Sequence, residues 1–330
     1  MTDSFAAVFD GLILDADGVI YRGPEPVPYA IEALVDAVRE IPWCVVTNNA
    51  ANPPGVVTAK LIGLGLEATD DNVVTSPHGA VAYLIDAGFE PGSKILVVGG
   101  PGIEDALVAG GFVPVRDRHI GPVAVVQGFG PEVGWHELAE ASYAIAGGAV
   151  WIATNLDRNI PTQYGLAPGN GALVGAVAEA VGRRPDAVTG KPEPLLFELA
   201  AGRMGASRPL VVGDRLDTDI EGANRAGMES LLVLTGVLTV DDLGLLAGLE
   251  PVARPRYLAA DLRCLAGAPR DVEICEHDPL TVDPLEVDPL DPVRALLHRI
   301  WSGSVDVSDV REEWQEACRA AAEGLRARDS

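Results

Sequence analysis

The sequence predicts an α/β protein with a doubly wound parallel sheet, an inserted second α/β domain and a small C-terminal appendage. Continuous apolar runs are typical of strands buried on both faces of a parallel sheet. Segments with helical spacing alternate with these runs, which favours a doubly wound arrangement. The runs of the main sheet lie at 8–14, 41–46, 209–212 and 230–234.

The alternation of strands and helices starts afresh in the middle of the chain. Strands are expected there at 94–98, 122–126 and 150–153. We therefore divide the chain into a core formed by 1–78 and 187–265, an inserted α/β domain at 79–186, and a C-terminal part at 266–330.

The C-terminal part differs in character from the rest. Asp-Pro-Leu occurs at 278, 283 and 288, and a proline in every unit predicts an extended acidic connector. Apolar residues then recur at helical spacing around Trp314, which predicts a helix that buries one stripe against the core or against another chain.

The composition restricts the classes of partner. The 330 residues carry 48 acidic and 24 basic side chains, a net charge of −24, which repels nucleic acid and anionic membranes and excludes both as partners. Four cysteines without CxxC spacing favour neither a zinc site nor a disulfide framework. The chain begins without a basic and apolar leader and has no run long enough to span a membrane, so we expect a cytoplasmic protein.

The first chemical motif is Asp15-Ala16-Asp17-Gly18, at the carboxyl end of the first apolar run. Two carboxylates there repel each other unless a cation lies between them. Ligands of open α/β sheets bind at these strand ends. The motif thus predicts a cation site, although a plain turn would also use Asp and Gly.

Three further motifs follow, each ambiguous alone. They are Thr47-Asn48-Asn49, Gly190-Lys191-Pro192, and the stretch from Gly213-Asp214 to Asp219. The first could bind an anion, the lysine of the second could neutralise a phosphate oxygen, and the carboxylates of the third could bind a hard cation. Turn formation and solvated surface are the alternative interpretations.

In this order the four motifs resemble those of the haloacid dehalogenase (HAD) superfamily, whose core is Rossmann-like. The resemblance extends to the NagD-like branch, with phosphoglycolate and p-nitrophenyl phosphatases and an inserted C2-type cap. It covers roughly 8–265. The additional stretches that carry it are 17–23, 153–157 and 168–172.

The resemblance implies a Mg²⁺-dependent phosphatase that acts through an aspartyl phosphate. Asp15 would be the nucleophile, and Asp17 the general acid and base. The phosphate would be held by Thr47, Asn48, Asn49 and Lys191. The metal would be held by Asp15, by the backbone carbonyl of Asp17 and by Asp214, with Gly18 and Asp219 in supporting roles.

The resemblance also implies a small phosphate ester as substrate, selected by the cap. Residues Asn155, Asp157 and Arg158 are the candidate specificity loop, with a structural turn as an equal alternative. We favour glycerol phosphate or phosphoglycolate, with a nucleoside monophosphate or pyridoxal phosphate as the alternative. Two other hypotheses are an inactive phosphate-binding scaffold and a C-terminal segment that regulates the enzyme or joins subunits into a homo-oligomer.

Overall fold

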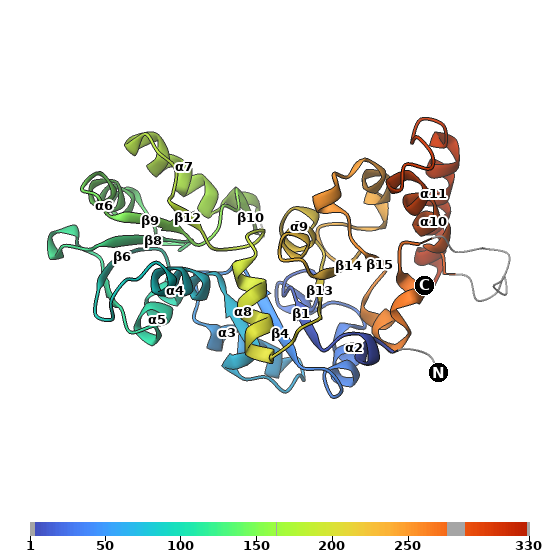
Figure 1. Ribbon diagram of the computed structural model, residues 1–330, viewed down its shortest axis with the longest axis horizontal. Helices are drawn as coiled ribbons and strands as arrows, with labels where there is room; N and C mark the ends of the chain where they lie inside the picture. The colour runs from blue at the N-terminus through green and yellow to red at the C-terminus, as the bar shows by residue number, and fades with distance from the viewer. Residues whose placement is uncertain (1–3, 163, 276–287, 329–330) are drawn as a thin grey trace. The chain divides into compact units, whose positions relative to one another are not determined.

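The structure is a computed structural model that describes residues 4–162, 164–275 and 288–328 (Figure 1). The chain divides into two compact units. The first unit contains 1–45, 64–66 and 201–330, and the second contains 46–63 and 67–200. The division predicted from the sequence, with boundaries at 78/79, 186/187 and 265/266, stays a prediction.

The main sheet has six strands in the order β15-β14-β13-β1-β4-β5. β1 lies between β13 and β4, and both pairings are parallel. All residues of β1, β4 and β13 are buried, as expected for strands covered on both faces. The strands are β1 (Gly11–Leu14), β4 (Trp43–Thr47), β5 (Val73–Thr75), β13 (Pro209–Gly213), β14 (Glu229–Val233) and β15 (Tyr257–Ala259).

Short helices and turns join the strands of the first unit. A π-helical turn, η3 (Leu216–Ile220), connects β13 to the next helix, and a 3₁₀ segment, η4 (Val240–Gly248), follows β14. The helices are α1 (Phe5–Val8), α2 (Ala30–Ala37) and α9 (Glu221–Arg225), and a small hairpin is formed by β2 (Tyr21–Arg22) and β3 (Glu25–Pro26).

The second unit contains a separate five-stranded sheet in the order β12-β9-β8-β6-β7. All its pairings are parallel. Its strands are β6 (Lys94–Val98), β7 (Val113–Val115), β8 (Ala124–Gln127), β9 (Val150–Ala153) and β12 (Ala187–Val188). The helices are α3 (Pro54–Gly63), α4 (Ser76–Asp86), α5 (Pro101–Ala109), α6 (Trp135–Ala146) and α7 (Asn170–Val181), while α8 (Leu195–Met204) runs across the boundary between the units.

The structure confirms the doubly wound prediction and corrects details of it. Residues 5–8 form α1, so β1 begins at Gly11 rather than at residue 8. An antiparallel hairpin of β10 (Asn159–Thr162) and β11 (Gly165–Pro168) was not predicted. Its residues include Pro161 and Pro168, and proline weakens the sequence signal of a strand.

The C-terminal part forms α10 (Asp291–Trp301) and α11 (Arg311–Arg328), drawn in red in Figure 1. The predicted apolar stripe exists. Val310, Trp314, Ala321 and Leu325 are buried within the first unit. The stripe therefore packs on its own core and does not remain open for another chain. The Asp-Pro-Leu units that start at 278 and 283 lie outside the described residues.

Candidate active site

Asp15 follows the last residue of β1, at the carboxyl edge of the main sheet. Leu14 pairs with Val212 of β13, and the Asp15 backbone N–H donates to the Val212 carbonyl at 2.9 Å. The strand register therefore holds the backbone of Asp15 beside the end of β13. Because Asp214 comes directly after β13, the two motifs leave neighbouring parallel strands at the same edge.

Three carboxylates meet at this edge. One oxygen each from Asp15, Asp214 and Asp219 lies within 4.8 Å of the other two. Asp214 and Asp219 are each only 1% exposed. Two unit charges about 4 Å apart repel by about 4 kcal/mol at an effective dielectric constant of about 20. A hard divalent cation that prefers carboxylate oxygen would remove this repulsion, so the donor set fits such an ion.

Asp219 reaches the group because the backbone turns sharply after β13. Its carboxylate accepts from the Arg215 backbone N–H at 3.1 Å and from the Thr218 hydroxyl at 3.3 Å. A Cβ on Gly213 would lie 2.2 Å from the Asp219 Cβ, so only glycine fits there. Asp219, expected in a supporting role, is thus the third carboxylate. Asp217 is exposed and pairs with Arg215.

Asp17 and Gly18 form the turn that leaves β1. Asp17 is exposed, and its side chain does not belong to the three-carboxylate group. Gly18 has φ +89°, and a Cβ there would lie 2.4 Å from Asp214 Oδ2. Glycine is therefore required both for the turn and for the close approach of Asp214. Nearby, burial and then the charges of Asp17 and Asp15 raise the pKa of Tyr21.

A loop after β14 completes the surroundings of Asp214. The Val237 backbone N–H donates to Asp214 Oδ2 at 2.5 Å, and the Thr235 hydroxyl donates to the Gly18 carbonyl at 2.6 Å. Between them, a Cβ on Gly236 would lie 1.8 Å from Asp214 Oδ2. We did not identify this loop from the sequence, although Thr235-Gly236 directly follows an apolar strand, as the other motifs do.

The second unit contains a polar group centred on Asn48. The Asn48 side chain accepts from the Lys191 backbone N–H at 2.8 Å, and it donates to the Lys191 carbonyl and to Asp157 Oδ2, both at 3.1 Å. The Asn48 backbone carbonyl accepts from the Asn155 side-chain amide at 2.8 Å. Asn48 therefore joins three of the predicted motifs, a role that spacing in the sequence did not reveal.

Thr47 and Asn49 form a local turn beside Asn48. The Asn49 backbone N–H donates to Thr47 Oγ1 at 3.2 Å, and the Asn49 side chain accepts from the Ala51 N–H at 2.8 Å. Thr47 is buried at the end of β4, and Lys191 is 5% exposed. A Cβ on Gly190 would lie 2.2 Å from the Thr154 carbonyl, so the backbone before Lys191 passes too close for a side chain.

The candidate specificity residues differ in their exposure. Asn155 is 3% exposed, and its side-chain oxygen accepts from the Asp157 N–H at 3.1 Å. Asp157 is half-buried, whereas Arg158 is exposed. Asn155 thus shapes the loop from within, and only Asp157 and Arg158 retain exposed side-chain surface.

Comparison with known proteins places this arrangement in a family. A model described as haloacid dehalogenase-like hydrolase matches residues 12–113, and a second HAD-hydrolase-like model matches 188–265. D-Glycerol 3-phosphate phosphatase of Mycobacterium tuberculosis is 45% identical over 262 residues, which are 79% of this chain and 72% of that protein. The chain belongs to the HAD-like hydrolases.

The other similarities of this HAD-like chain are also to phosphatases. Acid sugar phosphatase of Staphylococcus aureus is 35% identical over 239 residues, 71% of this chain and 90% of that one. The crystal structure of the M. tuberculosis glycerol phosphate phosphatase with magnesium has a TM-score of 0.83 at 39% identity and covers 92% of this chain and 93% of its own. The structure of the p-nitrophenyl phosphatase of Archaeoglobus fulgidus has a TM-score of 0.70 at 29% identity, and the match covers 77% of this chain and 97% of that protein.

The predicted family, branch and enzyme class are confirmed by these relatives. The chain is a HAD phosphatase, a phosphoric monoester hydrolase with a Rossmann-like core and an inserted cap. Among the described residues, no helix combines the length and the apolar character needed to cross a bilayer.

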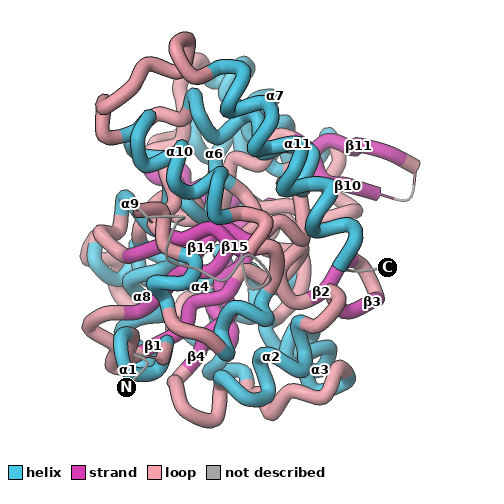
Figure 2. The backbone as a smooth tube through the Cα atoms, turned by 90° about the vertical axis from the view of Figure 1, so that its right-hand side faces the viewer, coloured by secondary structure: helices cyan, strands magenta, loops and turns pink. Residues whose placement is uncertain are grey.

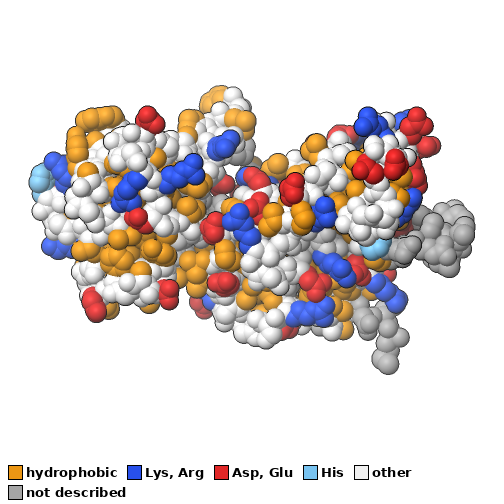
Figure 3. Space-filling view, turned by 45° about the horizontal axis from the view of Figure 1, so that its top comes forward, with side chains coloured by type: hydrophobic (Ala, Val, Ile, Leu, Met, Phe, Trp, Pro, Cys, Tyr) orange, Lys and Arg blue, Asp and Glu red, His pale blue; other side chains and the backbone are white. Residues whose placement is uncertain are grey.

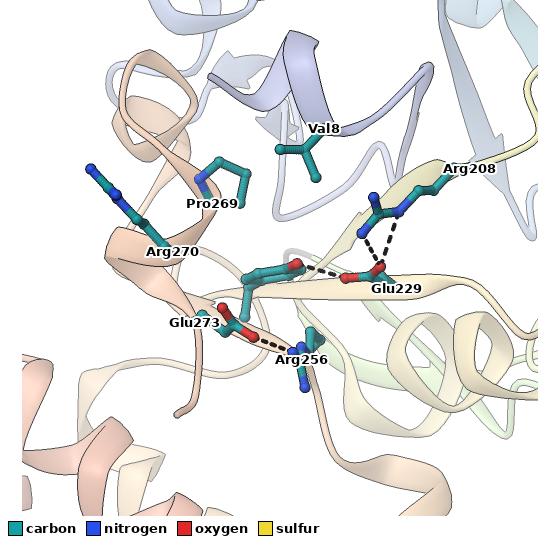
Figure 4. A pocket seen from close by; sticks show the side chains of 8 residues that line it. Val8, Arg208, Glu229, Arg256, Pro269, Arg270 and Glu273 are labelled. Atoms are coloured by element: carbon teal, nitrogen blue, oxygen red, sulfur yellow. Dashed lines mark hydrogen bonds and ion pairs between the residues drawn. The ribbon is translucent and has the colours of Figure 1, made fainter. Parts of the chain in front are cut away.

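A pocket of about 490 Å³ lies in the first unit of this phosphatase (Figure 4). It lies at the amino ends of strands in the main sheet, whereas Asp15 follows the carboxyl end of β1. Arg208 precedes β13, and Glu229 and Tyr257 begin β14 and β15. Arg208 and the Tyr257 hydroxyl both bond to Glu229, at 2.8 and 2.6 Å. Burial is the largest cause that raises the pKa of Tyr257, and its hydrogen bond to Glu229 raises the pKa further. Arg208 and Arg256 of the pocket pair with Glu229 and Glu273, whereas Arg270 pairs with Asp271 beside it.

Proposed function

We propose that this phosphatase depends on Mg²⁺ and hydrolyses a small phosphorylated metabolite, with glycerol phosphate as the first candidate. The observation that carries the proposal is the meeting of Asp15, Asp214 and Asp219 within 4.8 Å at the carboxyl edge of the main sheet. Mg²⁺ prefers a few carboxylates together with water and substrate oxygens, which suits this set. An inactive scaffold is not favoured, because the nucleophile and metal-carboxylate positions are both intact.

The choice of substrate is supported by the relatives. The glycerol phosphate phosphatase is more similar to this chain than the acid sugar phosphatase, at 45% against 35% identity. Both act, by name, on phosphorylated polyols or sugars. Phosphoglycolate is the second candidate, and a nucleoside monophosphate or pyridoxal phosphate is the alternative.

The proposed reaction has two steps. An Asp15 carboxylate oxygen attacks phosphorus, the bond to the ester oxygen breaks, and Asp17 donates a proton to the departing alcohol. Asp17 then takes a proton from water, whose oxygen displaces Asp15 and releases inorganic phosphate. A bound Mg²⁺ supplies charge neutralisation between the carboxylate and the phosphate. The exposure of Asp17 suits exchange of protons with both leaving group and water.

The phosphate ligands are proposed from the order of the family motifs. The Thr47 hydroxyl and the backbone N–H of Asn48 would donate to phosphoryl oxygens, and Lys191 would offset their charge. Because the Asn48 side chain bonds to the backbone of Lys191, we assign the phosphate contact to backbone rather than to this side chain. The Asn48 side chain would instead position the turn that carries the lysine.

The test of the proposed function is phosphate release from a panel of metabolite phosphates, measured with Mg²⁺, with EDTA and with Mg²⁺ restored in excess. We expect glycerol phosphate to have the highest kcat/KM, and EDTA to abolish turnover reversibly. Turnover that persists in EDTA would contradict the metal assignment. A preference of more than tenfold for a nucleotide or for pyridoxal phosphate would replace the substrate assignment and leave the metal assignment intact.

A further inference from the structure

The C-terminal helices lie beyond the part of the fold that the family models match, which ends at residue 265. The alignment with the p-nitrophenyl phosphatase of A. fulgidus covers 97% of that protein but only 77% of this chain. The M. tuberculosis glycerol phosphate phosphatase structure matches 92% of this chain. α10 and α11 are therefore an addition to the common fold, and their contacts indicate what they do.

The two helices share one apolar cluster with the segment that follows β14. Figures 1 and 2 show α10 and α11 on the side of the first unit that holds β14 and β15. Both helices pack on η4. The cluster is formed by Leu234, Leu238, Leu243 and Leu246 from the β14–η4 region and by Leu290, Val293, Leu296, Leu297, Trp314, Ala317, Ala321 and Leu325 from the C-terminal part, together with further residues of the core.

Polar contacts hold η4 against the same helices. The Trp301 indole N–H donates to the Leu246 carbonyl at 3.2 Å, and Arg326 pairs with Asp241. Thr239 caps η4, since its hydroxyl accepts from the Asp241 N–H at 3.3 Å and its own N–H donates to Asp242 at 2.9 Å. The start of η4 is thus fixed to the loop that precedes it.

That loop is the one that contacts Asp214. The Leu238 N–H donates to the Asp214 carbonyl at 3.3 Å, and the Val237 N–H donates to its carboxylate at 2.5 Å. The Leu238 side chain is 8% exposed and belongs to the cluster with α10 and α11. One short segment therefore contacts Asp214 through its backbone and, through the Leu238 side chain, belongs to the apolar cluster that it shares with the added helices.

We propose that α10 and α11 form a clamp that positions Asp214 for the divalent cation, by holding the 235–248 segment in place. The proposal rests on the proposed function, because it needs Asp214 to be a metal ligand. A carboxylate held in its binding orientation binds an ion more tightly than one that must be ordered on binding. Loosening the clamp should therefore weaken the affinity for Mg²⁺ more than it changes turnover at saturating Mg²⁺.

The test uses full-length variants that loosen the clamp without touching the carboxylates. Trp301→Phe removes the bond to Leu246, Arg326→Gln removes the pair with Asp241, and Trp314→Ala opens the shared cluster. We measure the Mg²⁺ dissociation constant by calorimetry, kcat at saturating Mg²⁺, and Tm. We expect the Trp301→Phe, Arg326→Gln double variant to raise the dissociation constant by about threefold to tenfold, up to about 1.4 kcal/mol, with kcat within about twofold of the parent.

Matched controls separate positioning from general destabilisation. Trp151→Phe removes an indole N–H bond of 3.1 Å to Gln127 in the second unit, and Arg39→Gln removes an exposed pair with Asp36 in the first. Trp151→Phe should lower Tm at least as much as Trp301→Phe, and Arg39→Gln, like Arg326→Gln, removes an exposed ion pair that contributes little to stability. Both controls should leave the Mg²⁺ dissociation constant unchanged. If Trp314→Ala fails to fold, the Mg²⁺ affinity of the Trp301→Phe, Arg326→Gln double variant decides whether the clamp exists.

Two outcomes would overturn the clamp, and they differ. The clamp is rejected if the clamp variants bind Mg²⁺ as tightly as the parent chain, or if the controls lose as much affinity for Mg²⁺ as the clamp variants do. Neither result contradicts the proposed function. An unaltered chain that neither binds Mg²⁺ nor needs it for turnover rejects the proposed function, and the clamp with it.

Discussion

Asp214 is enclosed by glycines on two sides. Gly18 and Gly236 each bring backbone so close to its carboxylate that an added Cβ would lie 2.4 or 1.8 Å from Oδ2. The Val237 N–H adds a hydrogen bond to the same oxygen. At the scale of single residues, the site is therefore determined by where side chains are missing as much as by which ones are present.

Replacing Gly236 with alanine tests this crowding. The methyl group cannot fit beside Asp214 unless the carboxylate or the loop moves, so we expect Gly236→Ala to raise the Mg²⁺ dissociation constant by more than tenfold. Calorimetric titration with Mg²⁺ measures the effect. Gly244→Ala in η4 is the control, because nothing lies within 4 Å of its added Cβ. Equal affinities in both variants would contradict the placement of this loop.

Replacing Asp15 with asparagine tests the nucleophile. An amide cannot form the acyl phosphate, so Asp15→Asn should lower kcat on p-nitrophenyl phosphate by at least about 10³-fold. Asp217→Asn, on the exposed carboxylate that pairs with Arg215, should stay within about twofold. Retained turnover in Asp15→Asn would mean that another group attacks phosphorus.

At the scale of elements, the second unit brings motifs together through loops. Asn48 follows β4, Asp157 lies between β9 and β10, and Lys191 precedes α8, and hydrogen bonds of 2.8–3.1 Å join them. Asp157 is therefore connected to the backbone of Lys191 through the side chain of Asn48. This contact makes the two interpretations of the loop, specificity and structure, separable by experiment.

Changing Asp157 distinguishes these interpretations. We expect Asp157→Ala to alter the ratio of kcat/KM for glycerol phosphate to that for p-nitrophenyl phosphate by at least about fivefold, if the loop selects the leaving group. Kinetics on both substrates provide the measurement. Arg184→Ala, an exposed change in the same unit, is the control. A uniform loss on both substrates would assign Asp157 to support of Asn48 alone.

At the scale of the whole molecule, the C-terminal part is anchored by a buried cation. Arg294 is 0% exposed, pairs with Asp288 and Asp291 at 2.7 and 2.6 Å, and donates to the Leu258 carbonyl of β15 at 2.9 Å. In a chain of net charge −24, this buried arginine and its two aspartates hold the start of α10 against β15. Figure 3 shows acidic and basic side chains interspersed on one face of the described residues.

Alkaline pH should loosen the packing of α11. Burial raises the pKa of Cys318 to about 11, whereas a thiol in an unfolded chain titrates near about 8.5. The unfolded state therefore loses its proton first, and this contribution to stability, complete below about pH 8.5, falls as the pH rises toward 11. Urea unfolding at pH 8 and pH 10 should show a smaller pH-dependent loss in Cys318→Ala than in the parent chain.

A pH dependence identical in the two proteins would contradict this assignment. Tyr257, whose pKa is also raised by burial, is present in both proteins and cancels in the comparison.

The sequence alone predicted the fold class, the main buried strands and the approach of Asp15 to Asp214 at one edge of the sheet, whereas the roles of Asp17 and Lys191 stay predictions. It could do so because apolar runs and the motifs after them are local patterns, and parallel strands end at a common edge. The stripe around Trp314 was local in the same way. The sequence did not show what the stripe packs against, because a helical period indicates which residues are buried but not which part of the protein covers them.

Tertiary structure alone decided which distant segments touch. Asp219 joined the carboxylate group because the turn after Gly213 is unusually tight. The Asn48 network and the contact of Val237 with Asp214 link residues that are 23 to 143 positions apart. Such contacts depend on how loops close after the strands have paired, and no periodicity in the sequence encodes that closure.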